Sequence, residues 1–253
     1  MGDLIGRYCS NGARIGIDRA GFHAEQGLNE RGFAVVDAAP VLAHARKIKC
    51  PEEILAMNLA LATAEDGMPR MRTALRNGVT EQELWALIEK GGKCLDYLLL
   101  ASGERTNPWQ QEASSRTIRA GDLVVFDCGL VGPFSYGADV SRAFRCGPGR
   151  PSDYQKKLYT LAWNEVMHNT RLLRPGTSFR DFMAGRCLRE PGFGDQAYPC
   201  AAHGLGMADE RPVILHSPEH EDHYDGEFEA GMVICVESYV GEIGGLEGVK
   251  LED

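Results

Sequence analysis

The pattern of apolar and polar positions divides the chain into a short first part and a long second part. Over residues 1–46 it predicts a strand at 13–19, a helix at 21–31 and a strand at 32–37. Elements this few and this short cannot bury their own apolar faces. We therefore expect residues 1–46 to be the last piece of a smaller α/β domain, and 47–253 to form the main domain.

The start of the main domain has the pattern of two helices and a strand. Residues 51–75 begin with a proline and repeat apolar side chains at helical spacing. Residues 80–93 open with Thr80-Glu-Gln-Glu83, which matches the capping box of a second helix. The apolar run at 98–103 predicts a strand.

The rest of the main domain repeats this order. Helices are predicted from Ser152 to about residue 172 and over 178–188. Paired strands are predicted on either side of them, at 123–129 with 136–146 and at 232–240 with 249–252. Two helices and a strand pair therefore precede two helices and another strand pair, which suggests an internal repeat.

Composition narrows the class of protein. The chain is 43% hydrophobic and 25% charged, with a net charge of −9, and this balance favours a soluble globular protein. It supplies no basic stripe for nucleic acid or an anionic membrane. The eight cysteines form no C-x-x-C pair, and the N-terminus lacks a signal-peptide pattern. We expect a cytoplasmic protein with free thiols.

Acidic residues interrupt several of the apolar runs. Asp127 lies in the strand Leu123-Val-Val-Phe-Asp-Cys-Gly129, and an ionised carboxylate is costly to bury unless a cation or donors compensate it. Similar positions, on or beside apolar runs, are held by Asp139, His203, Glu237 and Glu252.

Alternation places these acidic residues on defined faces of their strands. Two antiparallel hairpins that face each other would bring the four carboxylates to one point. Like charges raise each other's pKa, so such a cluster needs cations. Two divalent ions fit four carboxylates and one imidazole better than one ion does, and iron, manganese, cobalt and zinc suit these ligands.

These five residues, in their surroundings, resemble the pita-bread superfamily of methionine aminopeptidase, prolidase, aminopeptidase P and creatinase. The resemblance covers about residues 47–253. It implies a duplicated α/β (α+β) fold, a curved antiparallel sheet covered by helices, with a dinuclear metal centre. It also implies that 1–46 is a remnant of the N-terminal creatinase-like domain, that the C-terminal end is truncated, and that the protein is a homodimer.

Within the superfamily, three segments resemble the iron-type dimethylsulfoniopropionate lyase branch. They are Leu99–Glu112, Tyr136-Gly-Ala-Asp-Val-Ser-Arg142 and His203-Gly-Leu-Gly-Met-Ala-Asp-Glu-Arg-Pro212. The peptidases carry a second catalytic histidine in a His-Glu-x-Pro segment, where this chain has Asp209. The lyases have an aspartate there, and also a second aspartate two residues after the first ligand, where this chain has Gly129.

The lyase resemblance implies a metal-dependent carbon–sulfur lyase that releases dimethyl sulfide and acrylate. Iron is the metal it favours. Asp209 would be the general base, Tyr198 would assist it, and Trp109 would bind the sulfonium through its aromatic face. Two alternatives stay open at this stage: a dinuclear-metal Xaa-Pro peptidase or related C–N hydrolase, and a truncated, weakly active homologue.

Overall fold

The computed structural model of the chain describes residues 2–89, 99–193, 196–217 and 225–253. Backbone contacts divide the chain into two compact units, 1–46 and 47–253. The first unit holds a two-stranded parallel sheet, and its elements are α1 (Gly2–Ile5), β1 (Arg14–Ile17), α2 (Phe22–Asn29), β2 (Ala34–Asp37) and α3 (Ala39–Arg46).

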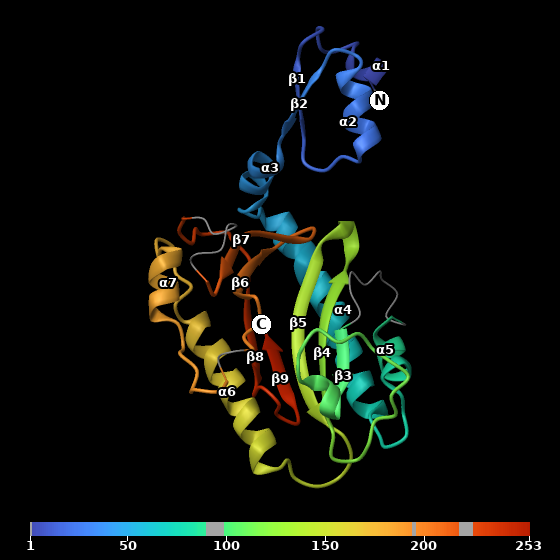
Figure 1. Cartoon of the computed structure of the whole chain (residues 1–253), viewed down its shortest axis with the longest axis vertical. Helices are drawn as coiled ribbons and strands as arrows, with labels where there is room; N and C mark the ends of the chain where they lie inside the picture. Colours follow the sequence, from blue (N-terminus) through green and yellow to red (C-terminus); the bar gives the residue numbers. More distant parts are fainter. Residues whose placement is uncertain (1, 90–98, 194–195, 218–224) are drawn as a thin grey trace. The chain divides into compact units, whose positions relative to one another are not determined.

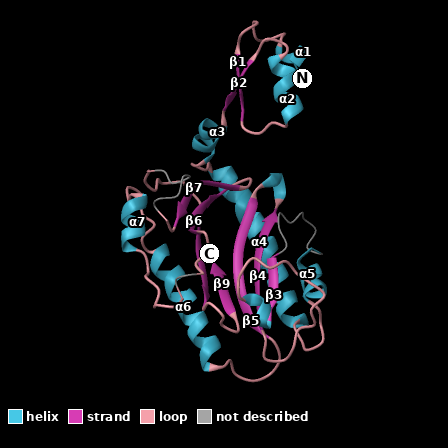
Figure 2. Cartoon of the chain, viewed as in Figure 1, coloured by secondary structure: helices cyan, strands magenta, loops and turns pink. Residues whose placement is uncertain are grey.

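The second unit is built around one seven-stranded sheet with the order β3-β4-β5-β9-β8-β6-β7 (Figures 1 and 2). All of its described strand pairs are antiparallel. Its strands are β3 (Leu99–Ser102), β4 (Leu123–Val131), β5 (Gly137–Arg145), β6 (Cys200–Leu205), β7 (Asp209–Leu215), β8 (Ile234–Gly241) and β9 (Gly248–Glu252).

The helices of this unit are α4 (Pro51–Ala74), α5 (Glu81–Glu89), α6 (Asp153–Thr170) and α7 (Phe179–Gly185). Helix α4 lies along β5 and α5 lies against β3, while α6 lies along β8 and β9 (Figure 1). The predicted repeat of two helices with a strand pair is therefore present, and the prediction of an α/β fold with an antiparallel sheet covered by helices is confirmed.

Local sequence explains where the long helices begin. The Ser152 hydroxyl accepts from the amide of Gln155, whose side chain accepts from the Ser152 amide, so α6 starts with a capping box. Thr80 and Glu83 make the same reciprocal contacts before α5. The end predicted for α5, near residue 93, lies outside the described residues.

The secondary-structure prediction was incomplete in two parts of the second unit. The helix predicted over 178–188 ends at Gly185, because Arg186 adopts an extended conformation and Arg189 turns inward to pair with Glu165. Strands β6 and β7 were not predicted at all, although β6 carries His203.

The largest apolar cluster packs against one face of the sheet, and the opposite face holds the acidic residues together with the smaller cluster of Trp109, Val125 and Tyr239. Val124, Phe126 and Cys128 of β4 belong to the apolar cluster formed with α4 and α5. Side chains alternate along a strand, so Asp127 points to the opposite face. On β9, Val249 and Leu251 pack in the cluster that α6 covers, and Lys250 and Glu252 alternate with them.

Candidate metal centre

Four polar residues form one row across four neighbouring strands. The register pairs Asp127 of β4 with Ser141 of β5. Glu252 of β9 pairs with Ser141 on one side and with Glu237 of β8 on the other. Directly opposed residues in antiparallel strands have Cβ atoms about 5 Å apart, so this register brings the side chains together. Each of the four is at most 1% exposed.

A second row completes the cluster. Asp139 precedes Ser141 by two residues, and Cys235 precedes Glu237 by two, so both share the face of the first row. His203 of β6 lies opposite Cys235. The Nε2 atom of His203 is 3.2 Å from Glu237 Oε1, 3.6 Å from Glu252 Oε1 and 3.7 Å from Asp139 Oδ2.

The two hairpins that carry these residues lie side by side. We expected them to face each other, but β5 and β9 are neighbours in one sheet. The cluster therefore forms across the seam between the two halves of the sheet. The five predicted ligands come from β4, β5, β6, β8 and β9, and all five are buried.

The electrostatics of the cluster show a shortage of positive charge. Burial, with repulsion from Glu252, raises the pKa values of both Asp127 and Glu237. Burial opposes the charged form of His203, yet Glu237 and Glu252 raise its pKa to about 12. Both effects favour bound protons, and a bound cation would replace those protons.

Lys250 supplies one positive charge inside the cluster. Its side chain is fully buried, and its Nζ atom is 2.8 Å from Glu252 Oε2 and 3.4 Å from Asp127 Oδ2, and also contacts Glu237. Burial lowers the pKa of Lys250, but the three carboxylates outweigh burial and raise it well above its ordinary value.

The atoms that face His203 are suited to a metal ion. Ligand atoms of Asp139, His203, Cys235 and Glu252 lie within 4.8 Å of one another. Glu252 Oε1 is buried and has no hydrogen-bond partner among the described residues. Carboxylate oxygens and imidazole nitrogen are ligands that zinc, iron and manganese accept. The residues present therefore fit a divalent metal.

The predicted catalytic residues lie on two sides of this cluster. The ring of Tyr198 lies 4.5 Å from Lys250 Nζ, in a cation–π contact. Asp209 is 62% exposed, and its Oδ1 atom is 4.0 Å from His203 Nδ1, at the ring edge that faces away from the carboxylates. Tyr198 thus borders the carboxylate row, and Asp209 borders the histidine.

A small pocket of about 220 Å³ lies beside Tyr198 and is lined by aromatic residues. Trp109 stacks on Tyr239 with ring centroids 6.1 Å apart, and both line the pocket with Tyr198. The indole N–H of Trp109 is buried and has no hydrogen-bond partner among the described residues. It is therefore an unsatisfied donor on a residue that lines the pocket.

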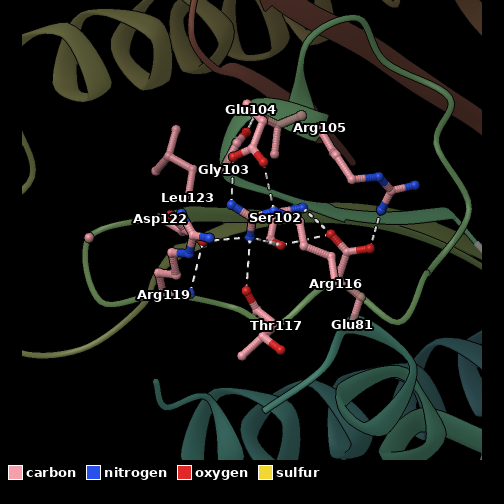
Figure 3. A network of polar contacts seen from close by, with 12 residues as sticks. Glu81, Ser102, Gly103, Glu104, Arg105, Arg116, Thr117, Arg119, Asp122 and Leu123 are labelled. Carbon is pink, nitrogen blue, oxygen red and sulfur yellow. Dashed lines mark hydrogen bonds and ion pairs between the residues drawn. The ribbon is translucent and has the colours of Figure 1, made fainter. Parts of the chain in front are cut away.

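The segment that carries Trp109 is braced by a polar network (Figure 3). Buried Glu81 accepts hydrogen bonds from the backbone and hydroxyl groups of Ser102 and Ser114, and it pairs with Arg105. Arg116 extends the network from the Ser102 hydroxyl to Asp122, next to the first residue of β4. The network thereby joins α5, β3 and the start of the strand that carries Asp127.

Sequence reasoning missed Lys250 and Ser141 in the centre. Lys250 interrupts an apolar strand two residues before Glu252, which is the same signal that identified Asp127. Arg142 donates to the carbonyl oxygen of Glu252 at 2.7 Å and pairs with Asp253. It therefore holds the end of β9 against β5.

Comparison with known proteins agrees with this architecture. Residues 56–253 match the model of metallopeptidase family M24. The dimethylsulfoniopropionate lyase DddP of Roseovarius nubinhibens is 32% identical over 261 residues, which cover 99% of this chain and 58% of the lyase. The lyase DddP of Roseobacter denitrificans is 32% identical over 252 residues, covering 95% of this chain and 56% of the lyase. The chain thus spans less than two thirds of these relatives.

Among solved structures, the prolidase from Pyrococcus furiosus matches with a TM-score of 0.84 and 25% identity, over 99% of this chain and 75% of the prolidase. In the part of the chain that the structure describes, no helix is long and apolar enough to cross a membrane. The conserved architecture and the family match lead to one conclusion. The chain belongs to metallopeptidase family M24, with the pita-bread fold of the prolidases.

Proposed function

We propose that the protein is a metal-dependent lyase that cleaves dimethylsulfoniopropionate into dimethyl sulfide and acrylate. The observation that carries this proposal is the aromatic pocket of Trp109, Tyr198 and Tyr239 beside the carboxylate cluster. A sulfonium cation is attracted to aromatic faces, and Tyr198 already holds a cation against its ring. The names of the relatives at 32% identity support the same reaction.

The sulfonium and carboxylate groups of the substrate suit two parts of the site, the aromatic pocket and the metal-binding cluster. The dimethylsulfonium group would lie among the aromatic rings, and the indole N–H of Trp109 would donate to the substrate carboxylate. A divalent ion held by His203 and its neighbouring carboxylates, iron by the resemblance, would polarise the substrate carboxylate and acidify the adjacent C–H bond.

The elimination needs one base and one departing group. Asp209 would take the proton from the α carbon, and the C–H electron pair would become the C=C bond of acrylate. The C–S bond then breaks, and its electron pair leaves with dimethyl sulfide. Burial and the nearby Glu237 raise the pKa of Tyr198, so its hydroxyl stays protonated and serves as a hydrogen-bond donor.

Headspace detection of dimethyl sulfide tests the proposal, with iron- or manganese-loaded protein and dimethylsulfoniopropionate. We expect release of sulfide that Asp209→Asn abolishes while bound metal is retained. Asp153→Asn is the matched control, because Asp153 is also exposed and lies on α6, away from the cluster. Sulfide release at the original rate by Asp209→Asn would show that the base is another residue.

The alternative function is hydrolysis of Xaa-Pro dipeptides, which the structural likeness to the Pyrococcus furiosus prolidase favours. The peptidases carry a histidine where this chain has Asp209, so the developing charge would lack that group. A dipeptide assay run in parallel separates the two functions. Dipeptide cleavage without sulfide release would replace the lyase proposal with a peptidase.

A further inference from the structure

Lys250 occupies the centre of the row of acidic residues. It lies two residues before Glu252 on β9 and is paired in register with Tyr239 of β8, so it shares the polar face. Its ammonium group reaches back to the row and is 2.8 Å from Glu252 Oε2 and 2.8 Å from the Ser141 hydroxyl. It also contacts Glu237 and Asp127.

The two oxygen atoms of each glutamate are divided between two positive partners. Glu237 Oε1 and Glu252 Oε1 face His203 Nε2, at 3.2 and 3.6 Å. Glu237 Oε2 and Glu252 Oε2 face Lys250 instead. Asp139 Oδ2 lies on the histidine side, 3.7 Å from Nε2, whereas Asp127 Oδ2 lies on the lysine side.

The distances from His203 Nε2 to its three carboxylate neighbours resemble the spacing of ligands around one ion. Ligand atoms that bind one ion at about 2.0–2.2 Å are separated from one another by roughly 3–3.5 Å. The three distances from His203 Nε2, 3.2, 3.6 and 3.7 Å, are close to this spacing. On the lysine side, the ammonium group of Lys250 contacts Asp127, Glu237 and Glu252.

We propose that the centre holds one divalent ion, bound by Asp139, His203, Glu237 and Glu252, and that Lys250 takes the place of a second ion. Asp127 is then the counter-ion of Lys250, a positioning residue in place of a metal ligand. This inference rests on the proposed metal-dependent function. It replaces the two ions that the number of carboxylates alone led us to expect.

A second ion would compete directly with Lys250. Bonded to Glu252 Oε2, it would share that oxygen with an ammonium nitrogen 2.8 Å away. Two positive centres on one oxygen repel each other. One divalent ion and one ammonium supply three positive charges against the four carboxylates, so a single ion removes most of the imbalance.

The number of ions can be measured independently of activity. The full chain is stripped with chelator, incubated with excess manganese(II), freed of unbound metal and analysed by mass spectrometry and electron paramagnetic resonance. We expect one manganese per chain with the six-line signal of an isolated ion. Two ions with a spin-coupled signal would overturn the inference and leave metal dependence intact. Protein that binds no manganese would overturn both.

Two aspartates provide a matched comparison. Asp127→Asn and Asp139→Asn make the same change at buried positions of paired strands. We expect Asp139→Asn to lower manganese affinity by more than tenfold and Asp127→Asn to lower it by less than threefold. Equal losses in the two variants would show that Asp127 is a ligand and would overturn the assignment.

Lys250→Met tests the role of the ammonium group itself. Methionine keeps most of the length of the side chain and removes its charge, so Glu252 Oε2 and Asp127 lose their ammonium partner. We expect this variant to take up a second manganese, whereas Lys250→Arg keeps one. If Lys250→Met fails to fold by circular dichroism, the Asp127 and Asp139 comparison still decides between the two arrangements.

Discussion

At the scale of single residues, His203 connects the two chemical parts of the site. Its Nδ1 atom lies 3.1 Å from the carbonyl oxygen of Gly204, so Nδ1 carries the proton and donates. Without a metal, Nε2 is also protonated toward Glu237 and Glu252, and a bound ion would replace that proton. The tautomer that suits a metal ligand is therefore set by the backbone of β6.

Replacing this ring should remove the metal. We expect His203→Ala to lower bound metal more than tenfold, since it deletes the only nitrogen in the proposed ligand set. Elemental analysis of the purified variant measures this. His168→Ala is the control, because His168 lies on α6 and contacts the carbonyl of Gly185. Wild-type metal content in His203→Ala would contradict the site as described.

Tyr198 is expected to act through its hydroxyl group. Tyr198→Phe keeps the ring against Lys250 and removes the O–H donor. We expect turnover of dimethylsulfoniopropionate to fall about 10²-fold, the scale of a lost proton-transfer partner, with bound metal unchanged. Steady-state kinetics with parallel metal analysis separate this from loss of the ion. Unaltered turnover would show that Tyr198 serves only as an aromatic wall.

At the scale of secondary-structure elements, one carboxylate joins α5 to β3. Glu81 is fully buried at the first turn of α5 and accepts from Ser102 and Ser114, with Arg105 as its counter-ion (Figure 3). A buried carboxylate that accepts this many hydrogen bonds stabilises the folded state, because its removal leaves several hydrogen-bond donors without an acceptor. The contact holds the segment that carries Trp109.

We expect Glu81→Gln to lower the free energy of unfolding by about 2–3 kcal/mol, the range for buried hydrogen bonds to charged groups. Glu104→Gln is the matched control in the same network, because Glu104 is 69% exposed and pairs with Arg116. Solvent screening limits its effect to less than about 1 kcal/mol. Urea denaturation of both variants measures the difference. Equal effects would mean that burial of Glu81 contributes nothing.

Glu104 should also give stability a pH dependence. Its bonds to Arg116 lower its pKa from 4.5 to about 2. A carboxyl group whose pKa is lowered by folding stabilises the folded state above pH 4.5, and this contribution is lost as the pH falls toward 2. We expect the small difference between wild type and Glu104→Gln to disappear over this window in denaturation curves. A constant difference down to pH 2 would exclude the contribution.

At the scale of the whole molecule, the site depends on both halves of the large sheet. Asp127 and Asp139 belong to the first half, and Glu237 and Glu252 belong to the second. A bound ion therefore links strands from both halves. Ligands that bind only the folded state stabilise it in proportion to the logarithm of their concentration.

Removing the metal should lower the melting temperature. At free metal 100-fold above its dissociation constant, binding adds about 2.7 kcal/mol to the free energy of unfolding. Differential scanning calorimetry with and without chelator tests this for the unit of residues 47–253. His203→Ala should melt at the same temperature in both conditions. A chelator effect of equal size in that variant would place the stabilising ion elsewhere.

Patterns within single elements were enough to predict most of the second unit. Capping residues such as Ser152 located helices, and an acid on an apolar strand located Asp127. The strands at 200–205 and 209–215 were missed because the first contains alanines and a glycine, which are depleted in strands, while Pro212 in the second is typical of a turn.

The pairing of strands that are distant in sequence could not be predicted from local sequence patterns. Which residues stand opposite each other depends on the register of β5 with β9, and this pairing joins Ser141 to Glu252 across the whole second half of the fold. A search for residue types that bind metal ions also missed Lys250. Its importance follows from its neighbours in the sheet, and these are known only once the strands are paired.

The row of Asp127, Ser141, Glu252 and Glu237 has a consequence for how the protein folds. The hydroxyl of Ser141 meets the carboxylate of Glu252 across 111 positions of sequence. Contacts this distant in sequence form slowly, because a long loop must close before they are made. The carboxylates meet only when β9 docks beside β5. Metal capture would thus be a late event in folding, and its time course would report the closing of the sheet.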